Sequence, residues 1–208
     1  MFEQPCRFLQ VLAGFAVVVS GSTWATAMGQ AFSSSDLVEK GKVSVDGHES
    51  FYRIRNLPVS SFPELPAAVA DALVARNCLI PQTYEAKRPE NVIHGSLERP
   101  GSSDWAALCS AGGEVSLLVF FSSAAASQPM VLVTAPKTER LQAHDLTGEL
   151  GFNWGIDPAK PERVHDAQAG MAHRPGAPDH DCVADSVIDH KTIYHLYRKG
   201  VWEKVDVE

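Results

Sequence analysis

The sequence predicts an α+β domain in which an antiparallel sheet meander carries one amphipathic helix and one or two short helices. Short apolar runs typical of strands follow one another between residues 91 and 134, separated by turns that contain Gly, Pro or Ser. One segment, at about 64–77, has the 3.6-residue apolar period of a helix. Closely spaced strands favour antiparallel pairing, so we expect a sheet with the helix packed on it.

The chain begins with the three parts of a secretory signal peptide, in residues 1–27. Arg7 provides a basic residue, Phe8–Ser20 is an apolar run, and Ala25-Thr26-Ala27 has the small residues that signal peptidase accepts. The alternative is a membrane anchor, but the apolar run is shorter than the about 20 residues that span a bilayer. We therefore expect cleavage, no stable membrane anchor, and a periplasmic or secreted mature protein.

Residues 28–40 are small and polar, which indicates a flexible leader, and residues 41–208 are long enough for a single domain. The net charge is −7 at pH 7. Cleavage leaves this charge unchanged, because the segment removed holds one acid, Glu3, and one base, Arg7. Binding to DNA or RNA depends largely on Lys and Arg neutralising phosphates, so the acidic composition predicts no nucleic-acid partner.

The first predicted elements are a hairpin and the main helix. Strands at Val43–Val45 and Phe51–Ile54 flank Asp46-Gly47, a pair that suits a two-residue hairpin turn. In the helix at about 64–77, one face carries apolar side chains at helical spacing: Leu65, Val69, Ala72 and Leu73.

The next part of the chain, from Ile80-Pro81-Gln82 to Pro89, is predicted to be a loop. Four strands then form the meander, at residues 91–97, 104–110, 114–122 and 130–134. The pattern weakens afterwards: residues 136–145 are compatible with a helix, 151–156 with a strand and 161–168 with a short helix. Three strands are predicted at the end, at residues 184–188, 192–197 and 201–205.

Three cysteines remain once Cys6 leaves with the signal peptide, and in an oxidising compartment two of them normally pair. We favour Cys78–Cys109, because packing of the predicted helix on the sheet brings a residue just after the helix close to a strand residue. Pairing of Cys182 with one of the other two is the alternative. An unpaired Cys182 is either buried and inert or available for an intermolecular bond.

Several sequence blocks resemble a group of uncharacterised exported proteins from soil bacteria. They are CLIPQ (78–82), NVIHGSLERPGSSDWAALCS (91–110), GFNWGIDPAKPERVHDAQAGM (151–171) and DSVIDHKTIYHLYRKGVW (185–202). The resemblance covers most of the mature chain. It implies that Cys78 and Cys109 belong together, and it implies no activity.

The best candidate for a metal site is the histidine-rich segment 165–182. Its candidate ligands are His165, His173, His180 and Cys182, because imidazole and thiolate groups bind zinc or copper. Their spacing matches no established zinc motif, and the alternative interpretation is an ordinary solvated loop that binds no cofactor. A metal-dependent or hydrolytic enzyme built on this segment is the alternative function.

A second candidate is an aromatic binding patch at His195, Tyr197 and Trp202. His195 and Tyr197 fall on one face of a predicted strand, and if that face is exposed it suits a protein or cell-wall partner. If it is buried, the same side chains fill the core. Because the sequence contains no catalytic motif, we expect a non-enzymatic binding module of the bacterial envelope or exterior.

Overall fold

The computed structural model of the protein describes residues 37–144, 146–205 and 207. The predicted signal peptide, residues 1–27, and the leader as far as residue 36 lie outside these described residues. Strand β1 (Val38–Val45) begins within the segment predicted as leader, because Val38, Glu39 and Lys40 pair with strand β2 (His48–Pro58).

Strands β1 and β2 form the predicted hairpin around Asp46 and Gly47. Val45 is paired with His48, and both turn residues have positive φ angles, 51° for Asp46 and 81° for Gly47. Such angles are those of the hairpin turn that matches the right-handed twist of the strands. The turn prediction is therefore confirmed.

In the described part of the chain, nine strands form a large sheet in the order β7-β6-β5-β3-β2-β9-β8, with β1 paired to β2 and β4 paired to β5. All of these pairs are antiparallel except β2–β9, which is parallel. The remaining strands are β3 (Leu79–Gln82), β4 (Val92–Gly95), β5 (Asp104–Ala111), β6 (Glu114–Phe120), β7 (Met130–Pro136), β8 (Leu141–Ala143) and β9 (Leu150–Phe152). Strands β4, β5, β6 and β7 make the predicted antiparallel meander.

A second sheet has four strands in the order β10-β11-β12-β13, all antiparallel. The strands are β10 (Trp154–Ala159), β11 (Cys182–Val187), β12 (Lys191–Arg198) and β13 (Val201–Val205). The chain passes from the large sheet to this small sheet at Asn153, between β9 and β10. The strand predicted at 151–156 is thus two strands in two different sheets.

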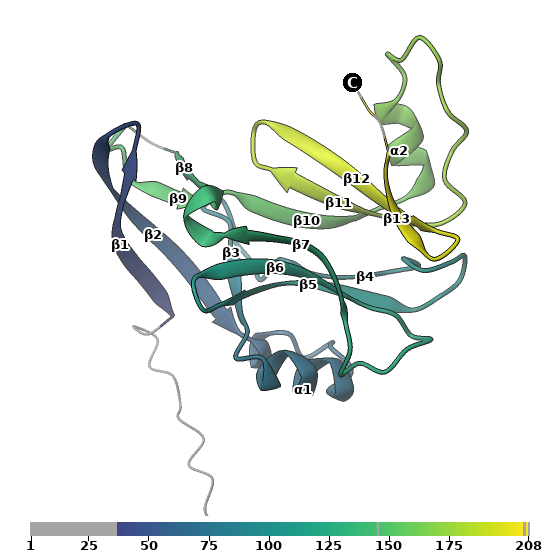
Figure 1. Ribbon diagram of the computed structural model, residues 1–208, viewed down its shortest axis with the longest axis horizontal. Helices are drawn as coiled ribbons and strands as arrows, with labels where there is room; N and C mark the ends of the chain where they lie inside the picture. The colour runs from purple at the N-terminus through teal and green to yellow at the C-terminus, as the bar shows by residue number, and fades with distance from the viewer. Residues whose placement is uncertain (1–36, 145, 206, 208) are drawn as a thin grey trace, which may run out of the picture. The chain divides into compact units, whose positions relative to one another are not determined.

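The two sheets pack face to face, and one helix lies on the outer side of each (Figure 1). Helix α1 (Ala67–Ala75) packs on the large sheet and α2 (Pro161–Ala167) on the small one. Alternation along β5 produces these layers: Ala106 and Leu108 face the small sheet, whereas Ala107 and Cys109 face α1. A sheet-rich α+β fold is therefore confirmed.

Helix α1 is shorter than the predicted helix at about 64–77, and a clear amphipathic helix of that length is not confirmed. Pro66 precedes its first residue, and a proline disfavours helical geometry in the residue before it, so Leu65 is buried outside the helix. Asn77, with φ 55°, ends the helix as predicted. The amide of Cys78 donates to the carbonyl of Leu73 at 3.1 Å, which completes a Schellman cap.

Two segments outside the meander also differ from expectation. Residues 80–82 were expected in a loop but belong to β3, because Leu57 and Pro58 of β2 pair with Ile80 and Leu79. The segment compatible with a helix, 136–145, contains a short 3-10 turn, Lys137–Arg140, and then strand β8. In both places, pairing with a distant strand determines the local structure, which local sequence does not reveal.

The predicted disulfide between Cys78 and Cys109 is present, with the two Cα atoms 4.9 Å apart. It joins the residue that follows the helix cap to β5, beneath α1. Both cysteines belong to the apolar core between α1 and the large sheet. The disulfide therefore fastens the helix to the sheet face that it covers, and Cys182 is the free cysteine of the described residues.

Candidate functional site

The structure does not gather the predicted metal ligands. His173 is exposed in the loop before β11, His165 is partly exposed on α2, and Cys182 is fully buried in the small sheet. No group of three or more His, Cys, Asp or Glu side chains that could hold a metal occurs among residues 37–144, 146–205 and 207. The histidine-rich segment runs from a helix through a long loop into a strand, which keeps its candidate ligands apart.

Two of these candidate ligands, His180 and Cys182, are buried in surroundings that do not suit metal binding. His180 is nearly buried, and its Nδ1 lies 2.8 Å from Asp179 Oδ1. Burial raises the pKa of the Cys182 thiol to about 12, so this thiol stays protonated at neutral pH. A protonated, buried thiol is a poor nucleophile and a poor metal ligand.

The predicted aromatic patch is not an exposed surface. His195 is buried, with its Nε2 3.2 Å from Asp185 Oδ2, in the space between the two sheets. Tyr197 and Trp202 pack with Phe121, with ring centroids 4.6 to 6.0 Å apart. The face of β12 that carries His195 and Tyr197 turns toward the large sheet, so His195 is buried and the partly buried rings of Tyr197 and Trp202 pack against the core.

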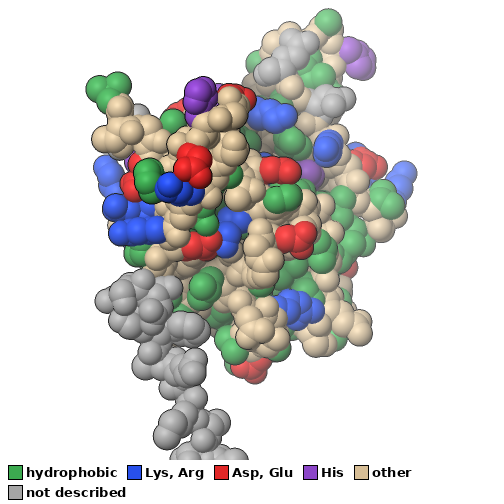
Figure 2. Space-filling view, turned by 60° about the vertical axis from the view of Figure 1, so that its left-hand side comes forward, with side chains coloured by type: hydrophobic (Ala, Val, Ile, Leu, Met, Phe, Trp, Pro, Cys, Tyr) green, Lys and Arg blue, Asp and Glu red, His purple; other side chains and the backbone are tan. Residues whose placement is uncertain are grey.

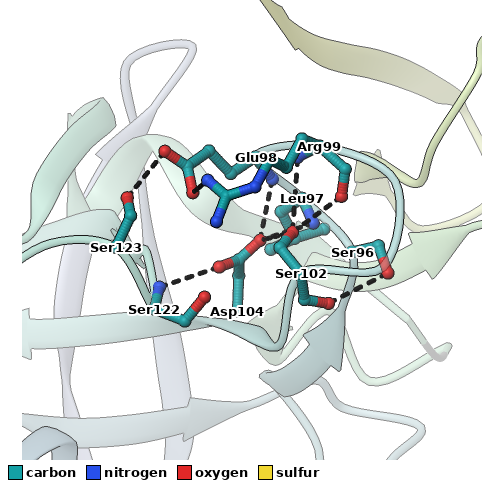
Figure 3. A network of polar contacts seen from close by, with 8 residues as sticks. All are labelled: Ser96, Leu97, Glu98, Arg99, Ser102, Asp104, Ser122 and Ser123. Atoms are coloured by element: carbon teal, nitrogen blue, oxygen red, sulfur yellow. Dashed lines mark hydrogen bonds and ion pairs between the residues drawn. The ribbon is translucent and has the colours of Figure 1, made fainter.

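A dense polar network surrounds Asp104 at the start of β5 (Figure 3). The Asp104 carboxylate is completely buried and accepts hydrogen bonds from the amides of Leu97, Glu98 and Ser122 and from the hydroxyl of Ser102. Burial alone raises the pKa of this carboxyl, but these hydrogen bonds outweigh burial and hold the pKa below its ordinary value. Because both carboxylate oxygens of Asp104 already accept hydrogen bonds, we interpret the network as a structural link between two loops and not as a ligand site.

The best candidate site lies on the outer face of the large sheet, beyond the end of α1. Leu57 and Ile80 are paired on this face and pack into the core beneath the helix. Farther along β2, the same face carries Arg55, Arg53 and Phe51, and the Phe51 side chain is 63% exposed. The outer face of this one strand therefore changes from apolar and covered to charged and open.

Three adjoining hollows of about 230, 370 and 520 Å³ lie over this open part of β2. All three share Glu149, and two of them share Phe51, so they form a continuous surface that we call the β2 groove. Figure 2 shows Lys and Arg side chains on this side of the molecule, with some acidic side chains among them. The residues that define the groove are Phe51, Arg53, Arg55, Tyr84, His144 and Glu149.

The basic side chains of the groove are only partly neutralised. Arg53 Nε lies 3.5 Å from Glu149 Oε2, and the Arg55 guanidinium donates to the carbonyl of Ala86 at 3.0 Å. Lys42, on the neighbouring strand, pairs with Glu49 and also lies 5.1 Å from the centroid of the Phe51 ring. Among the described residues, no acidic side chain forms an ion pair with Arg55.

One wall of the groove is a stacked pair of rings, Tyr84 and His144, with centroids 4.8 Å apart and planes within 10°. The pair lies against Gly151 of β9, where a Cβ atom would stand 2.5 Å from Tyr84 Cβ and 2.8 Å from His144 Cδ2. Only a residue without a side chain therefore permits this close approach. The Tyr84 hydroxyl donates to Asp189 Oδ2 of the small sheet at 3.0 Å, which connects the groove wall to the second layer.

The electrostatics of Tyr84 make its hydroxyl unsuited to act as a base. Burial, followed by the hydrogen bond to Asp189, raises the pKa of Tyr84 to about 12. A tyrosine that acts as a general base requires a pKa closer to neutrality. Tyr84 is therefore suited to offer a ring face and a neutral hydroxyl to a ligand.

The sequence contains one local signal for this site, which by itself does not identify it. Phe51, Arg53 and Arg55 occupy alternate positions of a strand, so a strand prediction places them on one face. Nothing local, however, indicates that this face is uncovered or that Tyr84, His144 and Glu149 lie beside it.

Among the described residues, no helix is long and apolar enough to cross a membrane. Comparisons with protein-family models, with curated proteins and with solved structures found no match to this chain.

Proposed function

We propose that this protein is a non-catalytic binding domain that acts outside the cytoplasm and holds its ligand in the β2 groove. The observation that carries the proposal is the change along β2, from residues buried beneath α1 to Phe51, Arg53 and Arg55 in the open. An exposed aromatic ring beside arginines with unpaired N–H groups places an apolar surface next to charged hydrogen-bond donors, and aromatic and Arg side chains are enriched among the residues that dominate binding.

The location outside the cytoplasm is supported by the signal-peptide pattern of residues 1–27 and by the Cys78–Cys109 disulfide. Disulfides persist in oxidising compartments and are rare in the cytosol. Mass spectrometry of the protein exported by its host is expected to find an N-terminus at or close to Met28. An intact Met1 on the functional protein would contradict the proposed location and would not affect the proposed binding site.

The absence of catalysis is proposed on chemical grounds. A serine–histidine contact does occur, with Ser103 Oγ 2.8 Å from His94 Nε2. Both residues are exposed, no carboxylate among the described residues orients His94, and neither residue lines the β2 groove. A nucleophile normally needs a base that a third group holds in place, within a site that excludes water.

The experiment is to probe the purified protein on arrays that carry neutral glycans, acidic glycans and peptides. We expect binding to a subset of probes, and loss of that binding when Arg53 and Arg55 are both replaced by Gln. The charge control is Arg163→Gln on α2, which removes one of the two positive charges that the double substitution removes, at a residue outside the groove, and should retain binding. Binding that survives the double substitution, or cleavage of a bound probe detected by mass spectrometry, would overturn the proposal.

A further inference from the structure

The chemistry of the β2 groove also indicates what kind of ligand it accepts, and this inference depends on the proposed function. We propose that the ligand is a carboxylate-bearing polysaccharide that lies across β2. Three properties of the groove support this ligand class: its charge, the spacing of its arginines and its ring surfaces.

The charge of the groove is opposite to that of the protein. Lys40 and Lys42 from β1, together with Arg53 and Arg55 from β2, line hollows that contain two acids, Glu49 and Glu149. The whole chain has a net charge of −7. A local excess of positive charge attracts an anionic ligand even on an acidic protein. Salt screens the repulsion from the distant acidic side chains more than it screens the attraction to the nearby basic ones.

The groups that carry this charge suit carboxylates. Arg53 reaches Glu149 only through Nε, and Arg55 reaches a backbone carbonyl through one terminal nitrogen, so each guanidinium keeps N–H groups without a partner in the described structure. A guanidinium binds a carboxylate through two parallel hydrogen bonds. Arg53 and Arg55 are two positions apart on one strand face, about 7 Å along the strand, which places two such donors in a row. Two donors in a row favour a ligand with repeated carboxylates.

The ring surfaces suit sugars. Phe51 presents an exposed ring, and the Tyr84–His144 stack presents another flat wall with polar atoms at its edge. Flat rings with apolar faces and polar edges contact sugar rings, which also have apolar faces and polar edges. The hollows are open and shallow, so they suit a chain lying on the surface more than an enclosed small molecule.

The position of β2 within the sheet argues against an extended acidic peptide. Peptides commonly add to a sheet as an extra strand by pairing with the backbone of an edge strand. Strand β2 pairs with β1 along residues 48–55 on one side, and with β9 at residues 52–53 and β3 at residues 55–58 on the other side, so the backbone that carries Arg53 and Arg55 is already paired. A ligand over these arginines therefore contacts β2 through its outward side chains.

The test compares four polymers in solution by isothermal titration calorimetry: polygalacturonate, its fully methyl-esterified form, dextran sulfate and poly-L-glutamate. We expect polygalacturonate to bind, and the ester, which has the same sugar without the charge, to bind at least about tenfold more weakly, because charged hydrogen bonds are lost. Arg53→Gln and Arg55→Gln should each weaken binding of polygalacturonate by about tenfold, whereas Arg163→Gln should not. Affinity should also fall as salt is raised.

The possible failures are distinguishable. Equal binding of the ester, stronger binding of dextran sulfate or of poly-L-glutamate, or no binding of any polymer would each overturn the assigned ligand class. The proposed function would survive such a result if array binding still depended on Arg53 and Arg55. Polygalacturonate binding that is unaffected by either arginine substitution would overturn both the ligand site and the proposed function.

Discussion

The outer face of the large sheet has two ends that belong to one layer of the fold and have opposite properties. At one end, Ile80 and Cys109 are buried beneath α1 and Leu57 is partly buried against them, and the Cys78–Cys109 disulfide holds the helix in place. At the other end, Phe51 and Arg53 are open to solvent. The first end contributes to stability, and we propose that the second end contributes to binding.

Helix α1 covers one end of this face and leaves the other end open. A nine-residue helix is about 14 Å long and about 10 Å wide, whereas neighbouring strands lie about 4.8 Å apart. Such a helix covers only part of a sheet with several strands. Pro66 and Asn77 mark the two ends of the helix.

The largest change in the free energy of unfolding is expected from loss of the disulfide at the covered end. Reduction, or replacement of both Cys78 and Cys109 by Ala, should lower the free energy of unfolding by roughly 3–4 kcal/mol, because the bond closes an interval of 31 residues. Urea denaturation in the presence and absence of dithiothreitol measures the loss. A Cys182→Ala background removes the free thiol from the experiment, and an unchanged midpoint on reduction would contradict the role of the disulfide.

The next effect concerns the helix itself. Leu73 of α1 is completely buried against the sheet, so Leu73→Ala should cost about 3 kcal/mol through the cavity that it leaves. Val74, the next residue, is 60% exposed, and Val74→Ala is a matched control that should cost less than about 0.5 kcal/mol. Thermal denaturation of the two variants compares them directly. Similar melting temperatures for the two variants would mean that the face of α1 that carries Leu73 does not stabilise the protein.

Asp104 tests whether a buried polar group far from the groove is structural. Asp104→Asn should lower the free energy of unfolding by about 2 kcal/mol at pH 7, because the amide replaces one acceptor oxygen with a donor. The native pKa of Asp104 lies below its ordinary value of 3.8, so its contribution is complete above that value and is lost as the pH falls through the lower native pKa. Urea titrations at pH 7 and at pH 2 to 4 should therefore show the two proteins converging in acid. A constant difference across this range would exclude the ionised carboxylate as the cause.

A smaller effect is expected at the wall of the groove. Gly151→Ala places a Cβ against Tyr84 and His144, so the stacked rings must move, at a cost of about 1–2 kcal/mol. Gly176→Ala is the control, since no atom lies within 4 Å of a Cβ there, and it should be neutral within about 0.5 kcal/mol. Chemical shifts of the His144 ring report the displacement. An unmoved ring in the Gly151 variant would show that the close approach does not hold the wall.

The smallest effect on stability should come from the open end. Replacing Arg53 and Arg55 by Gln is expected to change the free energy of unfolding by less than about 0.5 kcal/mol, because exposed ion pairs contribute little. The same double variant should lose the ligand in the binding experiments described above. A variant that loses more than about 2 kcal/mol would place these arginines among the structural residues and would weaken the proposed division between the two ends.

Local sequence predicted much of the large sheet and little of the site. The hairpin at Asp46-Gly47 and the strands of the meander were predictable because turn residues and apolar runs are local signals. Strand β3 was not, because Leu79 and Ile80 become a strand only by pairing with β2. Whether His195 and Tyr197 lie on an exposed or a covered face could not be predicted for a related reason: alternation shows that two residues share a face, and it does not show what covers that face.

The sequence by itself determined the sheet-rich class and the helix end at Asn77, since these depend on short-range signals, and among the few possible cysteine pairs it favoured Cys78–Cys109. Only the tertiary structure decided that the outer face of β2 is covered at Leu57 and open at Phe51, Arg53 and Arg55. That outcome depends on where a short helix ends over a wide sheet and on the approach of residues 84, 144 and 149 from distant parts of the chain. These are long-range contacts, and residue periodicity contains no information about them.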